Sequence, residues 1–185
     1  MDKKLVSRGH SDEDGDTQSL ETLLARSSAA ASPHTKGIFG NDTMTAKEIE
    51  AFVSKRTAVA VATTDREGHP HIAATDLIVV QGRFFIGQSQ GSASLKHIRR
   101  DERVALLLMQ GWRRHLLLEG QTSCLADNDP MTSQVQAAEK ERLGFTSQII
   151  VEVRPSRMFG WKSGGPRAKT RACLLYTSPS PRDRG

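Results

Sequence analysis

The pattern of apolar and polar positions predicts six β-strands in the middle of the chain. Runs rich in β-branched, aliphatic and aromatic residues, bounded by turn residues, lie at 57–64, 71–80, 83–88, 104–109, 113–127 and 147–155. Short turns join the first three runs, which leaves only antiparallel pairing between them. The run Val104–Met109 is apolar at every position, so we expect both of its faces to be buried. Gly120 inside the fifth run predicts a bulge or a close backbone approach.

Short helices are predicted between these strands by their end signals. Thr45 and Glu48 form a capping box before a helix at 46–55. The segment GSASLKHIRRDER, residues 91–103, reads as a connecting helix with a short apolar stripe. Asp129 followed by proline, with Gly144 further on, brackets another helix.

These elements predict a mainly β fold with short helices, of the α+β class. A six-stranded antiparallel split β-barrel fits the order of strands, although alternation alone does not separate a barrel from a sandwich. We assign this domain to residues 43–165. Residues 1–42 are polar, small and charged, which predicts a disordered tail that is at most weakly helical, around Leu20–Ala25.

The C-terminal end changes abruptly in character. Cys173–Asp183, CLLYTSPSPRD, resembles one translated frame of a transposase adaptor used in sequencing libraries. We therefore interpret 173–185 as non-native and 166–172 as a truncated native segment, and leave both out of the fold.

Charge and cysteine usage exclude several classes of protein. The net charge of +5 is uneven, because residues 83–114 carry seven basic and only two acidic side chains. Such a segment attracts anions, but no aromatic residues interleave the charges, so we expect no nucleic-acid partner. No apolar run is long enough to span a membrane. The two cysteines lack metal-ligand spacing, which predicts no metal site and a reducing, cytoplasmic location.

The ordered motifs resemble a known family. The matching pieces are Asp65–His71 (DREGHPH), Gly82–Phe85 (GRFF), the Gly-Ser-rich turn before the basic helix, Arg103–Leu106 (RVAL) and Arg113–Gly120 (RRHLLLEG). Together they are similar to the pyridoxamine 5'-phosphate oxidase-like flavin-binding split barrels, over roughly residues 45–162. The resemblance implies a homodimer that binds FMN at the subunit interface.

The resemblance also implies a phosphate site. In the family, hydroxyl and basic side chains after the third strand hold the FMN phosphate, which here gives Ser92, Ser94 and Lys96. A helix N-terminus and a lysine both favour an anion. The alternatives are that Ser92 is only a helix cap and that Lys96 is only solvated.

Five further positions carry over from the family as contacts of the flavin ring. Ala73, Ala74 and Thr75 fall on the strand that lines the flavin, or else they fill the barrel. His115 falls where a glutamine contacts the ring, or is an ordinary strand residue. Trp161 falls at a flavin-contacting tryptophan, or plugs the barrel end.

The resemblance implies an FMN-dependent oxidoreductase that acts on an unknown small molecule. Because the cofactor transfers the electrons, the lack of a catalytic triad is no objection, and no catalytic residue is identified. The oxidase itself has Arg-Lys after Gly-Ser, whereas this chain has Ala93-Ser94, which argues against pyridoxamine phosphate oxidation. The open alternatives are a non-enzymatic flavin-binding protein and a split barrel that binds deazaflavin or haem. The candidate haem ligands are His71, His97 and His115.

Overall fold

The computed structural model describes residues 20–39, 42–55 and 58–162. Predictions for residues 1–19 and 163–185, including the interpretation of 173–185 as non-native, lie outside these ranges. The helices are α1 Leu20–Ala29, α2 Pro33–Phe39, α3 Ala46–Val53, α4 Ala93–Arg100 and α5 Pro130–Leu143. The strands are β1 Ala58–Thr64, β2 Pro70–Val80, β3 Arg83–Gln88, β4 Arg103–Gln110, β5 Arg114–Cys124 and β6 Ile149–Lys162.

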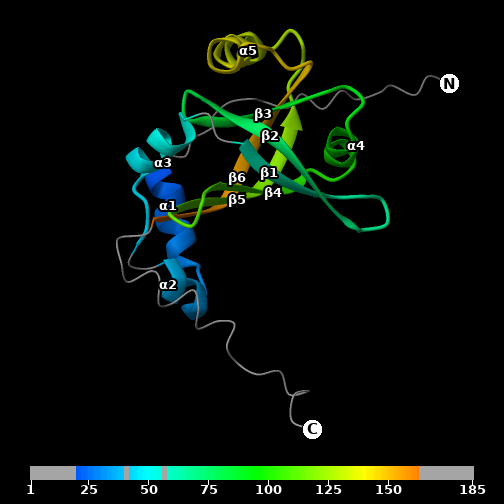
Figure 1. Ribbon diagram of the computed structural model, residues 1–185. Coiled ribbons are helices and arrows are strands. Elements are labelled where there is room, and N and C mark those ends of the chain that lie inside the picture. The colour runs from blue at the N-terminus through cyan, green and yellow to red at the C-terminus, as the bar shows by residue number, and fades with distance from the viewer. Residues whose placement is uncertain (1–19, 40–41, 56–57, 163–185) are drawn as a thin grey trace, which may run out of the picture.

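The six strands form a closed antiparallel barrel in the order β1-β2-β3-β6-β5-β4 (Figure 1). This confirms the predicted mainly β fold with a six-stranded antiparallel barrel, including the meander from β1 to β3. Alternate residues of each strand point inward, so Val59 and Val61 of β1 share the core with Leu106 and Leu108 of β4. Burial of these side chains supplies the main stabilisation of the barrel.

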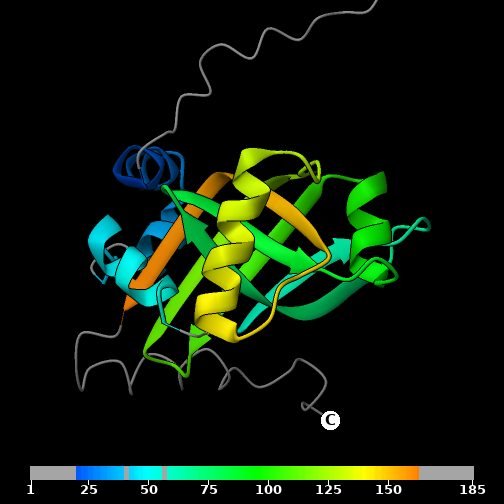
Figure 2. The same ribbon diagram turned by 90° about the horizontal axis from the view of Figure 1, so that it is seen from above.

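Two helices close opposite ends of the barrel. In Figures 1 and 2, α3 and α4 lie at its two ends, and each inserts an apolar stripe into the core. Ile49 and Phe52 carry the stripe of α3, and Leu95 and Ile98 carry that of α4. The third covering helix, α5, lies across the outside of β2 and β3 (Figure 2), where a second apolar cluster surrounds Val135.

The N-terminal helix α1 packs along β6. The Ser27 hydroxyl accepts a hydrogen bond from Met158 N at 2.9 Å. Just before α3, Met44 N donates to Gly160 O at 3.0 Å, and Lys162 N donates to Asp42 O at 2.8 Å. Because β3 pairs with β6 only as far as Val153, these contacts supply partners to the stretch of β6 that β3 does not reach.

Three sequence-based expectations need correction. The sixth strand runs to Lys162 instead of ending at Pro155, because Pro155 lies at the irregularity opposite Gly120 and the strand continues past it. The short helix α2 was not predicted. The expectation that both faces of Val104–Met109 are buried is wrong for the single chain, since Leu107 is 37% exposed and Met109 is 43% exposed. Both side chains point out of the barrel, where no helix of the described residues covers them.

The capping box of α3 also ties this helix to the end of β6, and it predicts a pH dependence of stability. Lys162 Nζ lies 2.7 Å from both carboxylate oxygens of Glu48, and Thr45 N donates to the same carboxylate at 2.9 Å. Mainly through the hydrogen bond from Lys162, these contacts lower the pKa of Glu48 from 4.5 to about 2. A depressed carboxyl pKa stabilises the fold above pH 4.5, and that stabilisation is lost as the pH falls toward 2.

We expect Glu48→Gln to lower the melting temperature at neutral pH, and the difference from the parent chain to shrink steadily below pH 4.5. Thermal melts over this pH range measure it. Glu50→Gln is the matched control, since Glu50 is an exposed carboxylate on the same helix whose side chain makes no hydrogen bond to the described residues. An equal difference at pH values near 2 and 7 would contradict the assignment.

Candidate functional site

The outer face of β1, β2 and β4 carries a shallow groove of small and apolar side chains. The groove has a volume of about 330 Å³. We call it the alanine groove, and its lining residues are Ala58, Val59, Ala60, Ile72, Ala73, Ala74, Leu107 and Met109. Among them, Ile72 is 70% exposed. Alanines leave the backbone accessible, so the groove can accept a flat ring or a complementary protein surface.

The three predicted residues of β2 lie on both faces of the strand. Ala74 points outward and lines the alanine groove. Ala73 and Thr75 pair with the buried residues Val61 and Val59, which places their side chains on the inner face. The Thr75 hydroxyl donates to Gly87 O at 3.0 Å. Of the three, Ala74 therefore offers its side chain to a ligand on the outside of the barrel.

His115 and Trp161 lie together at the end of the barrel that α3 closes. They pair across β5 and β6, and their rings stack with centroids 5.2 Å apart and planes inclined by 30°. Trp112, in the turn between β4 and β5, forms a T-shaped pair with His115 with ring centroids 6.0 Å apart, and it is 78% exposed. We call these three residues the aromatic shelf. Sequence reasoning missed Trp112, for which the signal was an aromatic residue at the tip of a hairpin.

The predicted phosphate residues lie at the start of α4, at the opposite end of the barrel. Ser92 caps this helix by accepting from Leu95 N at 3.1 Å. The hydroxyls of Ser92 and Ser94 both donate to Gln88 Oε1 at 3.0 Å, and Ser94 is buried. Lys96 is exposed and makes no side-chain hydrogen bond or ion pair within the described ranges. Lys96 is therefore the member of this group that is free to meet an anion, and Gln88 is a neighbour that the sequence did not reveal.

Within one chain, the aromatic shelf and the predicted phosphate residues lie far apart. Strand β4 has 8 residues and begins at the α4 end, whereas His115 pairs with Met109 near its other end. At about 3.3 Å per residue, the strand spans roughly 25 Å. The aromatic shelf and the start of α4 thus flank the alanine groove from opposite ends of the barrel.

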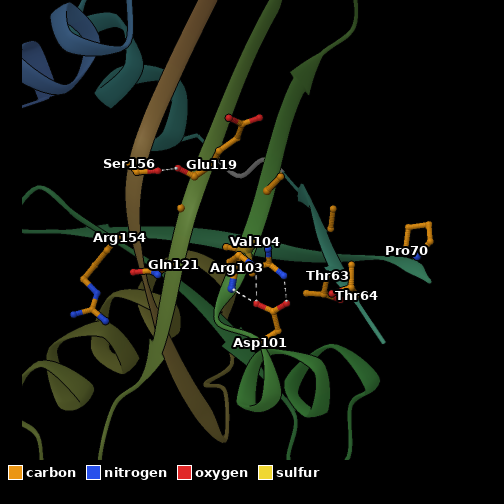
Figure 3. A pocket seen from close by; sticks show the side chains of 13 residues that line it. Thr63, Thr64, Pro70, Asp101, Arg103, Val104, Glu119, Gln121, Arg154 and Ser156 are labelled. Carbon is orange, nitrogen blue, oxygen red and sulfur yellow. Dashed lines mark hydrogen bonds and ion pairs between the residues drawn. The ribbon is translucent and has the colours of Figure 1, made fainter. Parts of the chain in front are cut away.

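A larger hollow of about 800 Å³ lies on the outer face of β1, β4, β5 and β6 (Figure 3). None of the eight predicted site residues lines it. Arg103 makes two hydrogen bonds to the Asp101 carboxylate, at 2.9 and 2.7 Å, and these bonds hold the pKa of Asp101 below its usual range. Arg154 extends away from that pair (Figure 3). Of the other charged residues in the lining, Glu119 is paired with Arg157 at 2.9 Å.

The histidines considered as haem ligands have different surroundings. His71 and His97 lie edge to face with ring centroids 5.0 Å apart, and His97 Nδ1 lies 3.1 Å from the Thr63 hydroxyl. Another group that could hold a metal ion within the described ranges, Asp65, Glu67 and His69, sits in the exposed turn between β1 and β2. There the Asp65 carboxylate already accepts from the backbone N–H of both other residues, as in an ordinary turn.

Comparison with known proteins identifies one family that matches most of the chain. A family model described as pyridoxamine 5'-phosphate oxidase matches residues 45–172. No curated protein sequence matches the chain.

No helix of the described residues is long and apolar enough to cross a bilayer.

Solved structures share the fold at low sequence identity. The conserved protein Rv2991 of Mycobacterium tuberculosis superposes with a TM-score of 0.59 at 22% identity, covering 69% of this chain and 96% of that one. HutZ, the heme storage protein of Vibrio cholerae, gives a TM-score of 0.55 at 18% identity, with coverages of 63% and 93%. A candidate pyridoxamine 5'-phosphate oxidase from Listeria innocua gives a TM-score of 0.53 at 14% identity, with coverages of 63% and 98%. These likenesses show the barrel fold.

Proposed function

The chain belongs to the pyridoxamine 5'-phosphate oxidase family, and from this premise we propose that it binds FMN and acts as an oxidoreductase on a small molecule. The observation that carries the proposal is the alanine groove, whose lining residue Met109 pairs across β4 and β5 with His115, the residue that stacks on Trp161. Small side chains let a flat ring approach the sheet, and an aromatic stack favours such a ring at the edge of the groove. The free ammonium group of Lys96 suits the phosphate.

The residues fit FMN in character, but they are divided between the two ends of one barrel. Ser92 and Ser94 would fix the start of α4, from which Lys96 would bind the phosphate. Ala74, His115 and Trp161 would hold the ring. When bound, the flavin supplies the electron transfer. The chain's own groups would bind the phosphate, orient the ring and exclude water from it. The family's Arg-Lys pair after Gly-Ser is missing here, so the substrate we propose is not pyridoxamine phosphate.

We also propose a homodimer, because a second copy would cover the exposed face and join the two halves of the site. Ile72, Leu107 and Met109 are all exposed on the outer face of neighbouring strands. Contiguous apolar surface of this kind commonly marks an interface between proteins. A twofold arrangement would place the aromatic shelf of one copy beside the α4 helix of its partner.

We expect Met109→Glu to convert the dimer into a monomer, because a buried, unpaired charge is strongly unfavourable in an interface. Analytical ultracentrifugation of the whole chain at micromolar concentration measures the mass. Phe145→Glu is the matched control, since Phe145 is 48% exposed and lies outside the alanine groove. A parent chain that is monomeric and still binds FMN would refute the dimer.

Haem is a second candidate, favoured by the shared fold of a protein described as heme storage and by the three histidines near the barrel ends. The visible absorption spectrum of the purified protein distinguishes these functions. The two visible absorption bands of an oxidised flavin would support FMN, and a Soret band would support haem and overturn FMN. A deazaflavin would give a spectrum distinct from both.

The cytoplasm is the location we propose, on the cysteine usage alone.

A further inference from the structure

The orientation of His115 is set by a single hydrogen bond. Its Nε2 lies 2.9 Å from the carbonyl oxygen of Gly111, four residues earlier in the β4–β5 turn. A carbonyl oxygen can only accept, so Nε2 must carry the proton and donate. In the neutral ring the other nitrogen, Nδ1, is then left with a lone pair.

The surroundings of His115 hold the ring in this position. Trp161 stacks against it and Trp112 meets it edge-on. Gly111 has φ of 54°, a conformation that glycine adopts readily, and this turn aims the carbonyl at Nε2. The imidazole is thus fixed by two rings and one carbonyl, and a half-turn about its Cβ–Cγ bond would put Cε1 where Nε2 lies and break the hydrogen bond.

His115 Nδ1 is open toward the outer face of the barrel. It makes no hydrogen bond to any of the described residues, and it is absent from their buried, unpartnered polar atoms. Met109, its partner across β4 and β5, also faces outward and lines the alanine groove. His115 therefore lies beside the groove that is proposed to take the flavin ring, with the lone pair of Nδ1 unpartnered among the described residues.

We propose that His115 Nδ1 accepts a hydrogen bond from the ring of the bound cofactor and so selects which edge of the ring lies at the shelf. The inference rests on the proposed function. The oxidised isoalloxazine ring has a single N–H group, at N3. N1, N5 and the two carbonyl oxygens only accept, and N10 carries the side chain. A partner that can only accept meets that edge alone, which makes His115 a positioning residue for the ring.

The tautomer can be tested without any flavin. In the cofactor-free protein with ¹⁵N-labelled histidine, two-dimensional NMR separates a protonated ring nitrogen from one that carries a lone pair. At a pH where His115 is neutral, we expect its Nε2 to be protonated and its Nδ1 to be bare. The reverse pattern overturns the proposal. The His115→Phe variant assigns the signals by their disappearance.

The contact itself is tested by comparing FMN with 3-methyl-FMN, which lacks the N3–H group. A neutral hydrogen bond of about 0.5–1.5 kcal/mol predicts that the parent chain binds FMN roughly 2- to 13-fold more tightly than the methylated ligand. His115→Phe keeps a flat ring against Trp161 but removes the acceptor, so the two ligands should then bind equally. His115→Gln, whose amide oxygen can accept, should restore the preference.

The possible failures are distinguishable. If FMN binds the parent chain and His115→Phe leaves its preference over 3-methyl-FMN unchanged, the contact at His115 is wrong while the flavin function stands. If neither ligand binds the parent chain, the proposed function is wrong, and the contact at His115, which depends on it, is wrong as well. A steric clash of the added methyl group would persist in His115→Phe and would therefore not imitate the expected result.

Discussion

Lys96→Ala is expected to weaken the binding of FMN about 10- to 150-fold while leaving riboflavin almost unchanged, because a hydrogen bond to a charged group contributes roughly 1.5–3 kcal/mol. Riboflavin lacks the phosphate, so it does not sense the lysine. The structure makes Lys96 the sharper probe, since Ser92 and Ser94 already donate to Gln88. Titration of both ligands by fluorescence measures the two affinities.

Lys47→Ala is the matched control for this experiment. Lys47 is also an exposed lysine near the start of an eight-residue helix, α3, but at the opposite end of the barrel from α4. Its removal should affect neither ligand. Equal and small effects of Lys96→Ala on FMN and riboflavin would show that the basic face of α4 is merely solvated. Ser92→Ala is a weaker test, because the loss of the helix cap itself costs about 1 kcal/mol.

Gly120→Ala is expected to destabilise the barrel by about 3 kcal/mol, which corresponds to a fall of roughly 6–12 °C in melting temperature. A methyl group at this position would lie 2.7 Å from Pro155 Cα and still closer to the carbonyl oxygen of Arg154. Both obstacles belong to the backbone of β6, so no side chain can rotate away. The substitution must shift one strand of the β5–β6 pair at its bulge.

Denaturant unfolding of the variant and of a matched control measures this effect. Gly91→Ala is the control, since a methyl group there has no atom within 4 Å and the residue has no positive φ. It should be neutral or stabilise by up to about 1 kcal/mol. A Gly120→Ala protein as stable as the parent chain would mean that β5 and β6 do not approach each other this closely.

Much of the fold was predictable because its local signals are strong and independent. Thr45 and Glu48 form the expected capping box. Asp129 caps α5, and Gly144 ends that helix with φ of 81°. Gly120 lies at the expected bulge. Each of these signals involves a few residues close in sequence, so no knowledge of the tertiary packing was needed to interpret them.

The remaining features depend on contacts between distant segments. Pro155 suggested the end of the sixth strand, but the strand continues because β5 runs alongside it and α1 supplies further partners. The apolar residues Leu107 and Met109 suggested burial, although nothing in one described chain covers them. An apolar pattern shows that a face avoids water, and it does not show which surface covers that face.

In the candidate site, too, the residue types could be predicted from the sequence, but their contacts across distant segments could not. The sequence could propose His115 and Trp161 separately, but their stacking depends on the register of β5 against β6. It could not show that Ser94 faces Gln88 inside the barrel. It also gave no sign that one chain holds the two halves of the proposed FMN site apart. These facts depend on register and on the direction in which α4 crosses the barrel end.

The contacts of Ser27, Asp42 and Met44 with β6 also bear on how the protein avoids aggregation through a strand edge. Beyond Val153, β6 has lost β3 as a neighbour, and a strand with one unpaired side is a template for pairing with another chain. The segment ahead of α3 covers that side. A chain trimmed to residue 45, where the family match begins, would keep all six strands and yet expose an edge open to aggregation.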